Sequence, residues 1–407
     1  MASFVKFPND QPHDPKNRTE ILNIIRHAGA ISVHEIVDVT GQSNAFVTRS
    51  IQRFKQLNLI SRIKVARGGQ PGKYRLELTL NSDAAYTLGL QLAESFIIGT
   101  VVNFKGEIEA SLQLPCQLGK HPSTKHWGDQ IEICVRRCID KAGLSLEQIS
   151  GIGIGLPGFI EGGSNNRHRS YLFESKGKSI YSQMQHRFDI PILMENDGIA
   201  AAMAHKWHGS GRAADNFIVI TLDDEVGAGI VINHQIYRGS AGGAGQFAHV
   251  VVVPGGEKCL CGKRGCIEAY AGGQAVIKAA KRACTDGQWT WASLDKLSLK
   301  DLIVTAQNGD VVVADIFRQA GAVLGLGISG LIQLFCPKKI IITGKVALAG
   351  DLLFAPMQEA LKIYVNEMVL NRVEINIHQS QPGQCAQGAA ILALKQVYKR
   401  FNPVNPI

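Results

Sequence analysis

Residues 1–80 combine helical and extended patterns of apolar positions. From residue 17 onward, isoleucines and leucines form an apolar stripe typical of an amphipathic helix. A second helix is predicted to begin after Ser32, where Glu35 three positions later completes a capping box, and to end at Gly41. Residues 1–16 are rich in proline, and we expect this tail to be disordered.

A third helix and a β-hairpin follow. Ser43 can cap the helix, in which Val47, Ile51 and Phe54 mark the buried face at i, i+4 and i+7. Residues 59–78 then alternate apolar and polar positions around a tip rich in glycine and proline, which predicts a hairpin. Together these elements predict a winged helix-turn-helix at 17–80. The side chains expected to contact DNA are Ser43, Asn44, Thr48, Arg49 and Arg53 on the helix and Arg67, Gln70 and Lys73 on the wing.

After residue 82 the pattern changes to α/β, and an internal repeat occurs. Residues 88–103 align with 218–233, so that Leu90 matches Ile220 and Gly99 matches Gly229. Each copy is predicted to form a strand, a loop and a second strand. Two related hairpins indicate two similar lobes with a cleft between them, although chance similarity of two apolar hairpins is an alternative.

Length, composition and charge narrow the class of protein. With 407 residues, 45% of them apolar, the chain is long enough for several cores. The absence of a signal peptide or a long uncharged apolar run favours a cytoplasmic protein without a membrane partner. Of the net charge of +9, positions 1–80 contribute +6, from 12 Lys/Arg and 6 Asp/Glu. Positions 49–75 contain eight Lys/Arg and no acid, which favours nucleic acid over a merely solvated face or a winged helix used for protein contact.

Three of the nine cysteines lie close together in the sequence. Cys259, Cys261 and Cys266 form a C-x-C-x4-C pattern among glycines, and His249 precedes them. Three thiolates and one imidazole are the closed tetrahedral set typical of structural zinc. Redox-active thiols are the main alternative, but no C-x-x-C pair accompanies them. We therefore predict a structural zinc site that shapes a loop and leaves no coordination position for hydrolysis.

Four motifs follow the winged helix in a fixed order: GLPG (155–158), ENDG (195–198), GGAGQFAH (242–249) and CLCGKRGCIEAY (259–270). In this order they closely resemble the ROK family of sugar kinases and sugar-responsive repressors, from about residue 17 to the C-terminus. The resemblance implies an actin-like, hexokinase-like α/β fold of two lobes, with a sugar bound between them.

The resemblance also implies roles for individual residues. Asn196 and Asp197 match sugar-hydroxyl binders, and Asp197 holds the position of the catalytic base in the kinases. His249 matches a residue that binds zinc through one ring nitrogen and can offer the other to the sugar, and Glu268 matches a second sugar contact. Gln246 stands where the family usually has a glutamate, so we expect a ligand that differs from that of the kinases, for example by carrying a negative group.

The chain departs from the kinases where they bind nucleotide. The first hairpin tip reads LQLAESF, without the glycines whose amides hold phosphate, and the second reads LDDEVGAG. Asp223, Asp224 and Glu225 would each disfavour a polyphosphate by about 1 to 4 kcal/mol at contact. Lys345 replaces a glycine in a third loop. We therefore expect that phosphoryl transfer has been lost.

These observations predict a DNA-binding regulator that represses carbohydrate genes, with operator DNA and a sugar or sugar-phosphate effector as ligands. We expect a homodimer or tetramer. The predicted lobes span 82–200 with the final helix at about 385–400, and 201–384 with the zinc loop. The alternatives are an ATP-dependent sugar kinase with an appended DNA-binding domain, and regulation by a docked protein of the sugar phosphotransferase system.

Overall fold

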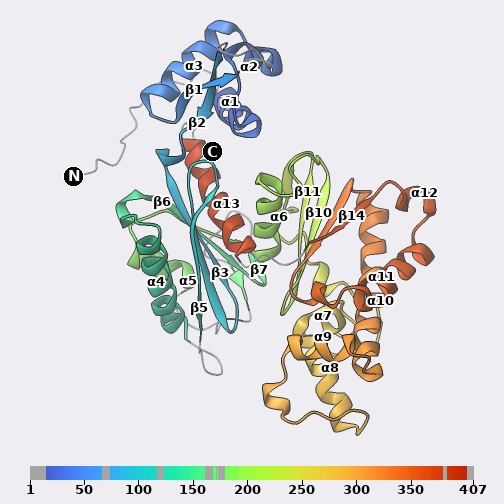
Figure 1. The fold of residues 1–407 in the computed structure, drawn as a ribbon. Helices are drawn as coiled ribbons and strands as arrows, with labels where there is room; N and C mark the ends of the chain where they lie inside the picture. Colours follow the sequence, from blue (N-terminus) through green and yellow to red (C-terminus); the bar gives the residue numbers. More distant parts are fainter. Residues whose placement is uncertain are drawn as a thin grey trace.

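The computed structural model describes residues 15–66, 74–116, 123–160, 168–170, 172, 179–378 and 383–400. Its N-terminal unit consists of three helices and an antiparallel hairpin, the arrangement of a winged helix-turn-helix (Figure 1). The elements are α1 (Pro15–Ala28), α2 (Val33–Thr40), α3 (Asn44–Gln56), β1 (Ile60–Ala66) and β2 (Tyr74–Leu80). Residues 1–14 of the tail predicted at 1–16, and the wing tip at 67–73, lie outside the described residues, whereas residues 15 and 16 belong to α1.

Local signals set the ends of these helices as the sequence predicts. The N–H of Glu35 donates to Ser32 Oγ at 3.2 Å, and the N–H of Ser32 donates to Glu35 Oε2 at 2.9 Å, which confirms the capping box. Gly41 ends α2 with a left-handed φ of 63°. Helix α1 begins at Pro15, slightly before the predicted start, and proline suits a first helical turn because no N–H is needed there.

Two five-stranded sheets form the lobes, and their strand orders correspond. In each sheet, three neighbouring strands are antiparallel, and two parallel strands extend the third of them. The order in lobe 1 is β5 (Ile108–Pro115), β4 (Phe96–Val102), β3 (Tyr86–Leu92), β6 (Ile149–Leu156) and β9 (Ile192–Asn196). The order in lobe 2 is β12 (Gln235–Tyr237), β11 (Val226–Ile232), β10 (Phe217–Leu222), β13 (Lys339–Thr343) and β14 (Glu374–Ile377). This common topology confirms the two similar lobes.

The alignment of the two hairpins is wrong by one position in the second strand. Leu90 pairs with Gly99 in lobe 1, whereas Ile220 pairs with Ala228 in lobe 2, so Ala228 is the counterpart of Gly99. The reason is that the tip of the second hairpin is shorter by a single position. Because side chains alternate between the faces of a strand, Gly229 consequently faces the opposite side of its sheet from Gly99.

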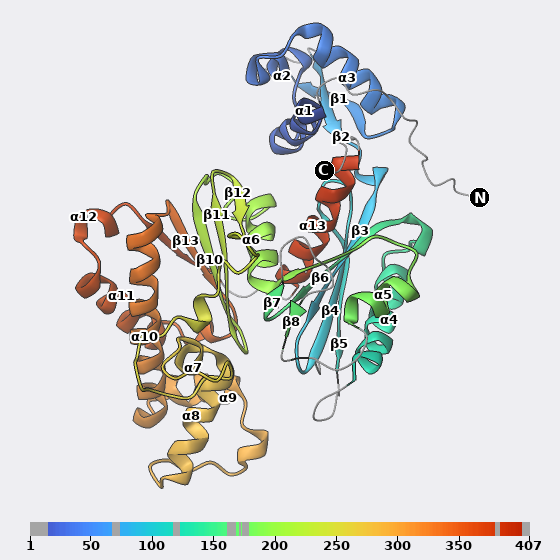
Figure 2. The same ribbon diagram turned by 180° about the vertical axis from the view of Figure 1, so that it is seen from behind.

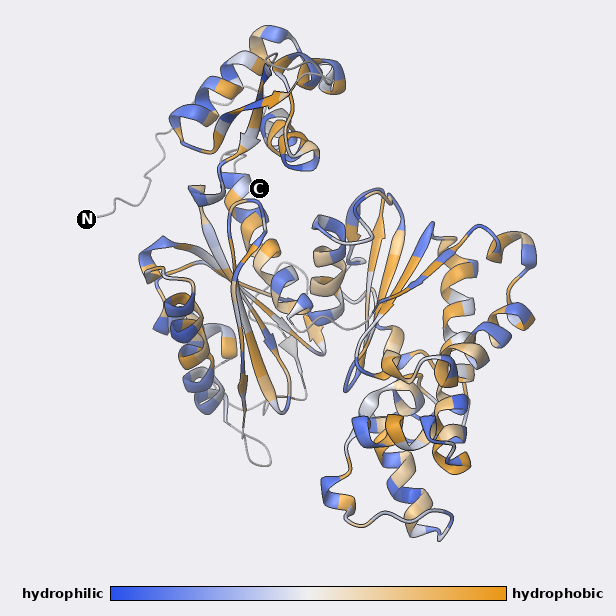
Figure 3. Ribbon diagram, viewed as in Figure 1, coloured by the Kyte–Doolittle hydropathy of each residue, from blue (hydrophilic) through white to orange (hydrophobic). Residues whose placement is uncertain are grey.

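Helices cover both faces of each sheet (Figures 1 and 2). In lobe 1, α4 (Thr124–Lys141) and α5 (Ile180–Arg187) lie on the outer face, and α13 (Gln384–Arg400) lies on the inner face. In lobe 2, α6 (Asp197–Trp207) lies on the inner face. The remaining helices are α7 (Glu268–Ala271), α8 (Gly273–Thr285), α9 (Leu299–Gln307), α10 (Val311–Phe335), α11 (Asp351–Tyr364) and α12 (Glu367–Leu370). Figure 3 shows hydrophobic residues concentrated in the central strands and in the helix faces that cover them.

Helix α10 alone among the described helices is long and apolar enough to cross a membrane by length and composition. It packs against α11, α8 and α9, and its Phe317, Leu324 and Ile328 are fully buried in the core of lobe 2. This is the usual position of an apolar helix in a globular core.

Helices α6 and α13 cross each other between the lobes. At the crossing, a Cβ atom on Gly388 would collide with the carbonyl oxygen of Ala200, so only glycine allows this approach. The predicted boundary between residues 200 and 201 falls inside α6, because one continuous helix connects the lobes there.

The winged-helix unit shares a hydrophobic core with the lobes. Ile21, Leu22 and Ile25 of α1 are fully buried in one cluster with Leu394 and Tyr398 of α13.

Contacts to the end of α6 add to this junction. The guanidinium carbon of Arg26 lies 3.9 Å from the centre of the Trp207 ring. Arg212, which follows α6, donates a hydrogen bond to the carbonyl oxygen of His27. The N-terminal unit is therefore packed against the segment that connects the lobes.

Candidate functional site

A cavity of about 430 Å³ lies between the lobes. Lobe 1 contributes the turn after β6, and lobe 2 contributes strand β11 and the cysteine-rich loop. The residues predicted to bind sugar all line it: Asn196, Asp197, Gln246, His249 and Glu268. The fold thus brings together residues from all four sequence motifs.

The side chain of Asn196 is engaged in hydrogen bonds within the protein that set the start of α6. Its Oδ1 accepts the N–H groups of Gly198 at 2.9 Å and Ile199 at 3.3 Å, which caps the helix. Its Nδ2 donates to the carbonyl oxygen of Gly158 at 2.9 Å, across from β9 to the turn after β6. Asn196 therefore holds Asp197, the first residue of α6, at the cavity wall.

Asp197, which is half-buried, and Glu268, which is buried, are two carboxyl groups at the wall of this cavity. Burial raises the pKa of Asp197 to about 6, and the negative charge of Asp223 adds to this effect. Burial raises the pKa of Glu268 to about 7, while the N–H of Val226, at 2.7 Å from Oε2, opposes the shift and Asp197 adds to it. Near neutral pH these groups can accept hydrogen bonds from hydroxyl groups or donate to them, and Asp197 can take up a proton.

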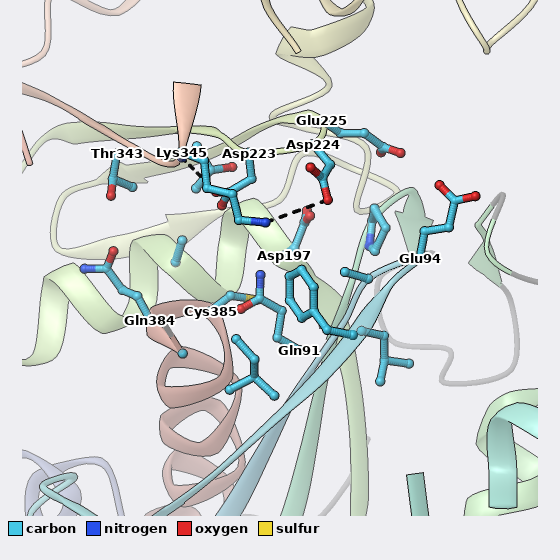
Figure 4. Close-up of a pocket in the computed structure, with 18 of the residues that line it drawn as sticks. Gln91, Glu94, Asp197, Asp223, Asp224, Glu225, Thr343, Lys345, Gln384 and Cys385 are labelled. Carbon is cyan, nitrogen blue, oxygen red and sulfur yellow. Dashed lines mark hydrogen bonds and ion pairs between the residues drawn. The ribbon is translucent and has the colours of Figure 1, made fainter. Parts of the chain in front are cut away.

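A second cavity of about 300 Å³ adjoins the first and shares Asp197 and Glu225 with it. It lies between the tips of the two hairpins, and Figure 4 shows Asp197 near the middle of its lining, between Lys345 above and Gln91 below. Its charged lining residues are five carboxylates and one ammonium group: Glu94, Asp197, Asp223, Asp224, Glu225 and Lys345. An anionic ligand would meet an unfavourable potential here.

Three backbone amides near this second cavity are already paired within the protein. The N–H of Lys345 donates to Asp223 Oδ1 at 3.0 Å. The first amides of α8, on Gly273 and Gln274, donate to the carbonyl oxygens of Asp223 and Asp224 at 2.9 and 3.0 Å. A phosphate would have to displace these bonds, because a helix N-terminus binds anions through such amides.

The cysteine-rich loop gathers four potential metal ligands. The ligand atoms of His249, Cys259, Cys261 and Cys266 all lie within 4.8 Å of one another. The sulfur atoms of Cys261 and Cys266 are 3.7 Å apart, and Nδ1 of His249 is 3.7 Å from the sulfur of Cys259. Tetrahedral zinc with bonds of about 2.3 Å separates two sulfur ligands by about 3.8 Å, so the group fits a zinc ion. These separations exceed the bond length of about 2.05 Å in a disulfide.

The glycines that bound the loop have conformations that its path requires. Gly262 and Gly265 have φ of 91° and 80°, and a Cβ on Gly265 would collide with the carbonyl oxygen of Val253. His249 is the last residue of a short 3-10 helix, Phe247–His249. With Nδ1 toward the cysteines, the histidine also lines the larger cavity.

Four of the five predicted DNA contacts on α3 lie in its exposed N-terminal half, and the fifth, Arg53, lies in its last turn. Ser43, Asn44, Thr48 and Arg49 have exposed or partly exposed side chains, and Arg53 is half-buried. The Ser43 hydroxyl caps the helix by accepting the N–H of Phe46 at 3.2 Å, so it has a structural role as well. Arg67, Gln70 and Lys73 lie outside the described residues.

Sequence reasoning missed two features of the site. Gly158, in the GLPG motif, supplies the carbonyl oxygen that orients Asn196. Glu195, next to Asn196, forms an ion pair of 2.6 Å with Arg238 of lobe 2. The ENDG motif contained the first partner of that pair, but no local pattern indicated the second.

Comparison with known proteins assigns the family. The sequence profile of the ROK family matches residues 87–396. The chain belongs to the ROK family. The xylose repressor of Bacillus subtilis is 23% identical over 94% of both chains, and the glucokinase of Halalkalibacterium halodurans is 31% identical over 57% of this chain and 72% of its own. The crystal structure of a ROK transcriptional regulator, a homologue of the Escherichia coli MLC protein, matches 95% of this chain and 96% of its own, with a TM-score of 0.79 and 22% identity.

The extent of these matches separates two kinds of ROK protein. The repressor and the regulator structure extend over the N-terminal unit, whereas the glucokinase covers little more than half of the chain. The matches to the repressor and to the regulator structure are thus long enough to extend over the winged-helix unit as well as the ROK domain.

Proposed function

We propose that this protein is a DNA-binding transcriptional regulator of carbohydrate genes that binds a sugar between its lobes and does not phosphorylate it. The observation that carries this proposal is the contrast between two adjoining cavities. One is lined by hydroxyl-binding groups such as Asp197 and Glu268, and the other by carboxylates where a kinase needs to hold phosphate.

The acidic cavity supports the loss of phosphoryl transfer. Asp223 already accepts the amide of Lys345, and the first amides of α8 bond to the second hairpin tip. Each carboxylate near a polyphosphate would cost about 1 to 4 kcal/mol. Magnesium ions could offset part of the charge, but not the amides that are already paired.

The cysteine cluster supports a structural zinc ion held by His249, Cys259, Cys261 and Cys266. When bound, zinc would fix the loop that leads into Glu268 and would orient the His249 ring. The histidine could then present its other ring nitrogen to the sugar. Because four protein ligands fill a tetrahedral ion, the metal is assigned a structural role.

The N-terminal unit supports operator binding through the exposed end of α3. Arg49 and Asn44 are exposed on α3, and we expect them to reach base edges in the major groove, while the basic segment around them suits phosphate contacts. Sugar binding would bias the approach of the lobes, and the packing of α1 on α6 and α13 would transmit that change to the winged helix. In a homodimer or tetramer this would alter the spacing of paired recognition helices.

A sugar kinase with an appended DNA-binding domain is the second candidate. Asp197 favours it, because its position at the base site and its raised pKa of about 6 suit a general base. Coupled ADP release with a panel of hexoses and amino sugars decides between the two. We expect no turnover above background, and turnover that disappears in Asp197→Asn would establish the kinase.

The sensor itself is tested by thermal unfolding with the same sugars and their phosphates. A ligand that binds only the folded state raises Tm whether or not catalysis occurs. Gel-shift assays with the stabilising sugar should then release DNA. Release by a cell extract, and by no sugar, would instead favour a docked phosphotransferase protein.

A further inference from the structure

Lys345 touches both lobes across the cleft. It follows β13 of lobe 2, and its Nζ lies 3.9 Å from Oδ2 of Asp224 in the same lobe. The same Nζ lies 4.7 Å from the centre of the Phe96 ring, which belongs to β4 of lobe 1. Figure 4 shows the lysine side chain lying across the acidic cavity toward Asp224.

Burial restrains Phe96, and backbone hydrogen bonds restrain Lys345 and Asp224. Phe96 is 9% exposed at the tip of the first hairpin. The backbone of Lys345 is tied to Asp223, and the carbonyl of Asp224 accepts an amide of α8 at 3.0 Å. A small rotation of one lobe relative to the other would therefore break the contact between the ammonium group and the ring.

We propose that Lys345 is a positioning residue that holds the two hairpin tips together in place of a nucleotide. Its ammonium group joins the carboxylate of Asp224 to the face of Phe96 and thereby limits how far the cleft opens. The inference rests on the proposed function in one respect. In a regulator that binds no nucleotide, a contact within the protein has to connect the two hairpin tips. The sugar then binds a cleft that is already partly closed.

The cleft contains a natural reporter of its opening. Cys385, at the start of α13, is 7% exposed and lines the acidic cavity. Burial raises the pKa of its thiol, so alkylation requires an opening that lets in reagent and water. Cys134 is fully buried between α4 and the sheet of lobe 1, away from the cleft, and serves as an internal control.

The test uses the full-length, zinc-loaded protein and iodoacetamide, with labelling of each cysteine followed by peptide mass spectrometry. We expect Lys345→Met to accelerate the labelling of Cys385 by about 3- to 10-fold, the range expected of a partly exposed cation–π contact. Lys345→Arg should restore the wild-type rate, because guanidinium also stacks on aromatic rings.

A double-mutant cycle identifies the ring as the partner. Phe96→Leu should accelerate labelling as Lys345→Met does, and the double variant should be no faster than either single variant. An unchanged rate in Lys345→Met, or additive effects in the double variant, would overturn the proposal. Faster labelling of Cys134 would also overturn it, because lobe 1 as a whole would then have loosened. Neither sugar nor DNA enters the experiment, so its result is independent of whether the protein regulates transcription.

Discussion

Replacing Glu268 with glutamine is expected to stabilise the ligand-free protein at pH 8 and to change little at pH 5. The side chain is 6% exposed, and burial raises its pKa to about 7, with the charge of Asp197 adding to the shift. Glutamine keeps an oxygen for the N–H of Val226, which lies 2.7 Å from the carboxylate, and removes the buried charge. The substitution therefore isolates the cost of ionising this group in the fold.

The sign follows from the direction of the shift. An acid whose pKa is higher in the folded than in the unfolded chain keeps its proton longer in the fold. The free energy of unfolding therefore decreases as pH rises from about 4.5, where the unfolded chain ionises, to about 7, where the folded chain does. The full difference corresponds to about 3 kcal/mol. At pH 5 less than about 1 kcal/mol of this cost is present.

Denaturant unfolding of the zinc-loaded protein between pH 5 and pH 8 measures this difference. The free energy of unfolding of Glu268→Gln should exceed that of the wild type by about 3 kcal/mol at pH 8 and by less than about 1 kcal/mol at pH 5. Glu359→Gln, on the exposed face of α11, is the matched control and should leave both values unchanged. A gain of equal size at both pH values, or a loss at both, would show that burial does not govern this carboxyl group. Weaker sugar binding by the same variant would show that the carboxylate of Glu268 contributes to recognition of the sugar.

Three further variants test the other parts of the proposal. Cys261→Ser should reduce the zinc content measured by atomic absorption from about one ion per chain to none, and zinc that persists would exclude this ligand set. Arg49→Ala should weaken operator binding by about 1 to 3 kcal/mol in gel-shift titrations if the side chain reads a base, whereas an unchanged profile would remove it from the interface. Arg26→Met should leave sugar binding and DNA binding each intact in calorimetry and gel shifts but reduce the effect of sugar on DNA affinity. His27→Ala is its control, because His27 contacts Arg212 through its backbone carbonyl, and an undiminished effect of sugar in Arg26→Met would refute the coupling.

The sequence predicted those features that depend on neighbours along the chain. The capping box of Ser32 and Glu35 and the glycine at residue 41 are local signals, and the structure contains each of them. The cysteine spacing likewise predicted a cluster that the fold completes with His249. Such patterns can be predicted because the hydrogen-bond partners or metal ligands lie within one short segment of the chain.

Features that depend on contacts between distant segments could not be predicted from the sequence. Apolar alternation located both hairpins but could not show that one tip is shorter than the other, and this displaced the match of Gly99. The ENDG motif identified Asn196 but not the bond from its Nδ2 to the carbonyl oxygen of Gly158, which lies almost forty residues earlier in the chain. The stacking of Arg26 on Trp207 joins the first helix to the far end of α6, and no periodicity reports such a contact.

The continuous core beneath α1 restricts how this protein can be taken apart. Deleting the winged-helix unit would expose the apolar surface of α13 around Leu394 and Tyr398, which α1 now covers. A foreign winged helix grafted onto the lobes would need matching isoleucine and leucine side chains as well as the same recognition helix. If α3 reads the operator as proposed, substitution of its exposed side chains would therefore alter operator specificity with less disturbance of the core than exchange of the whole winged-helix unit.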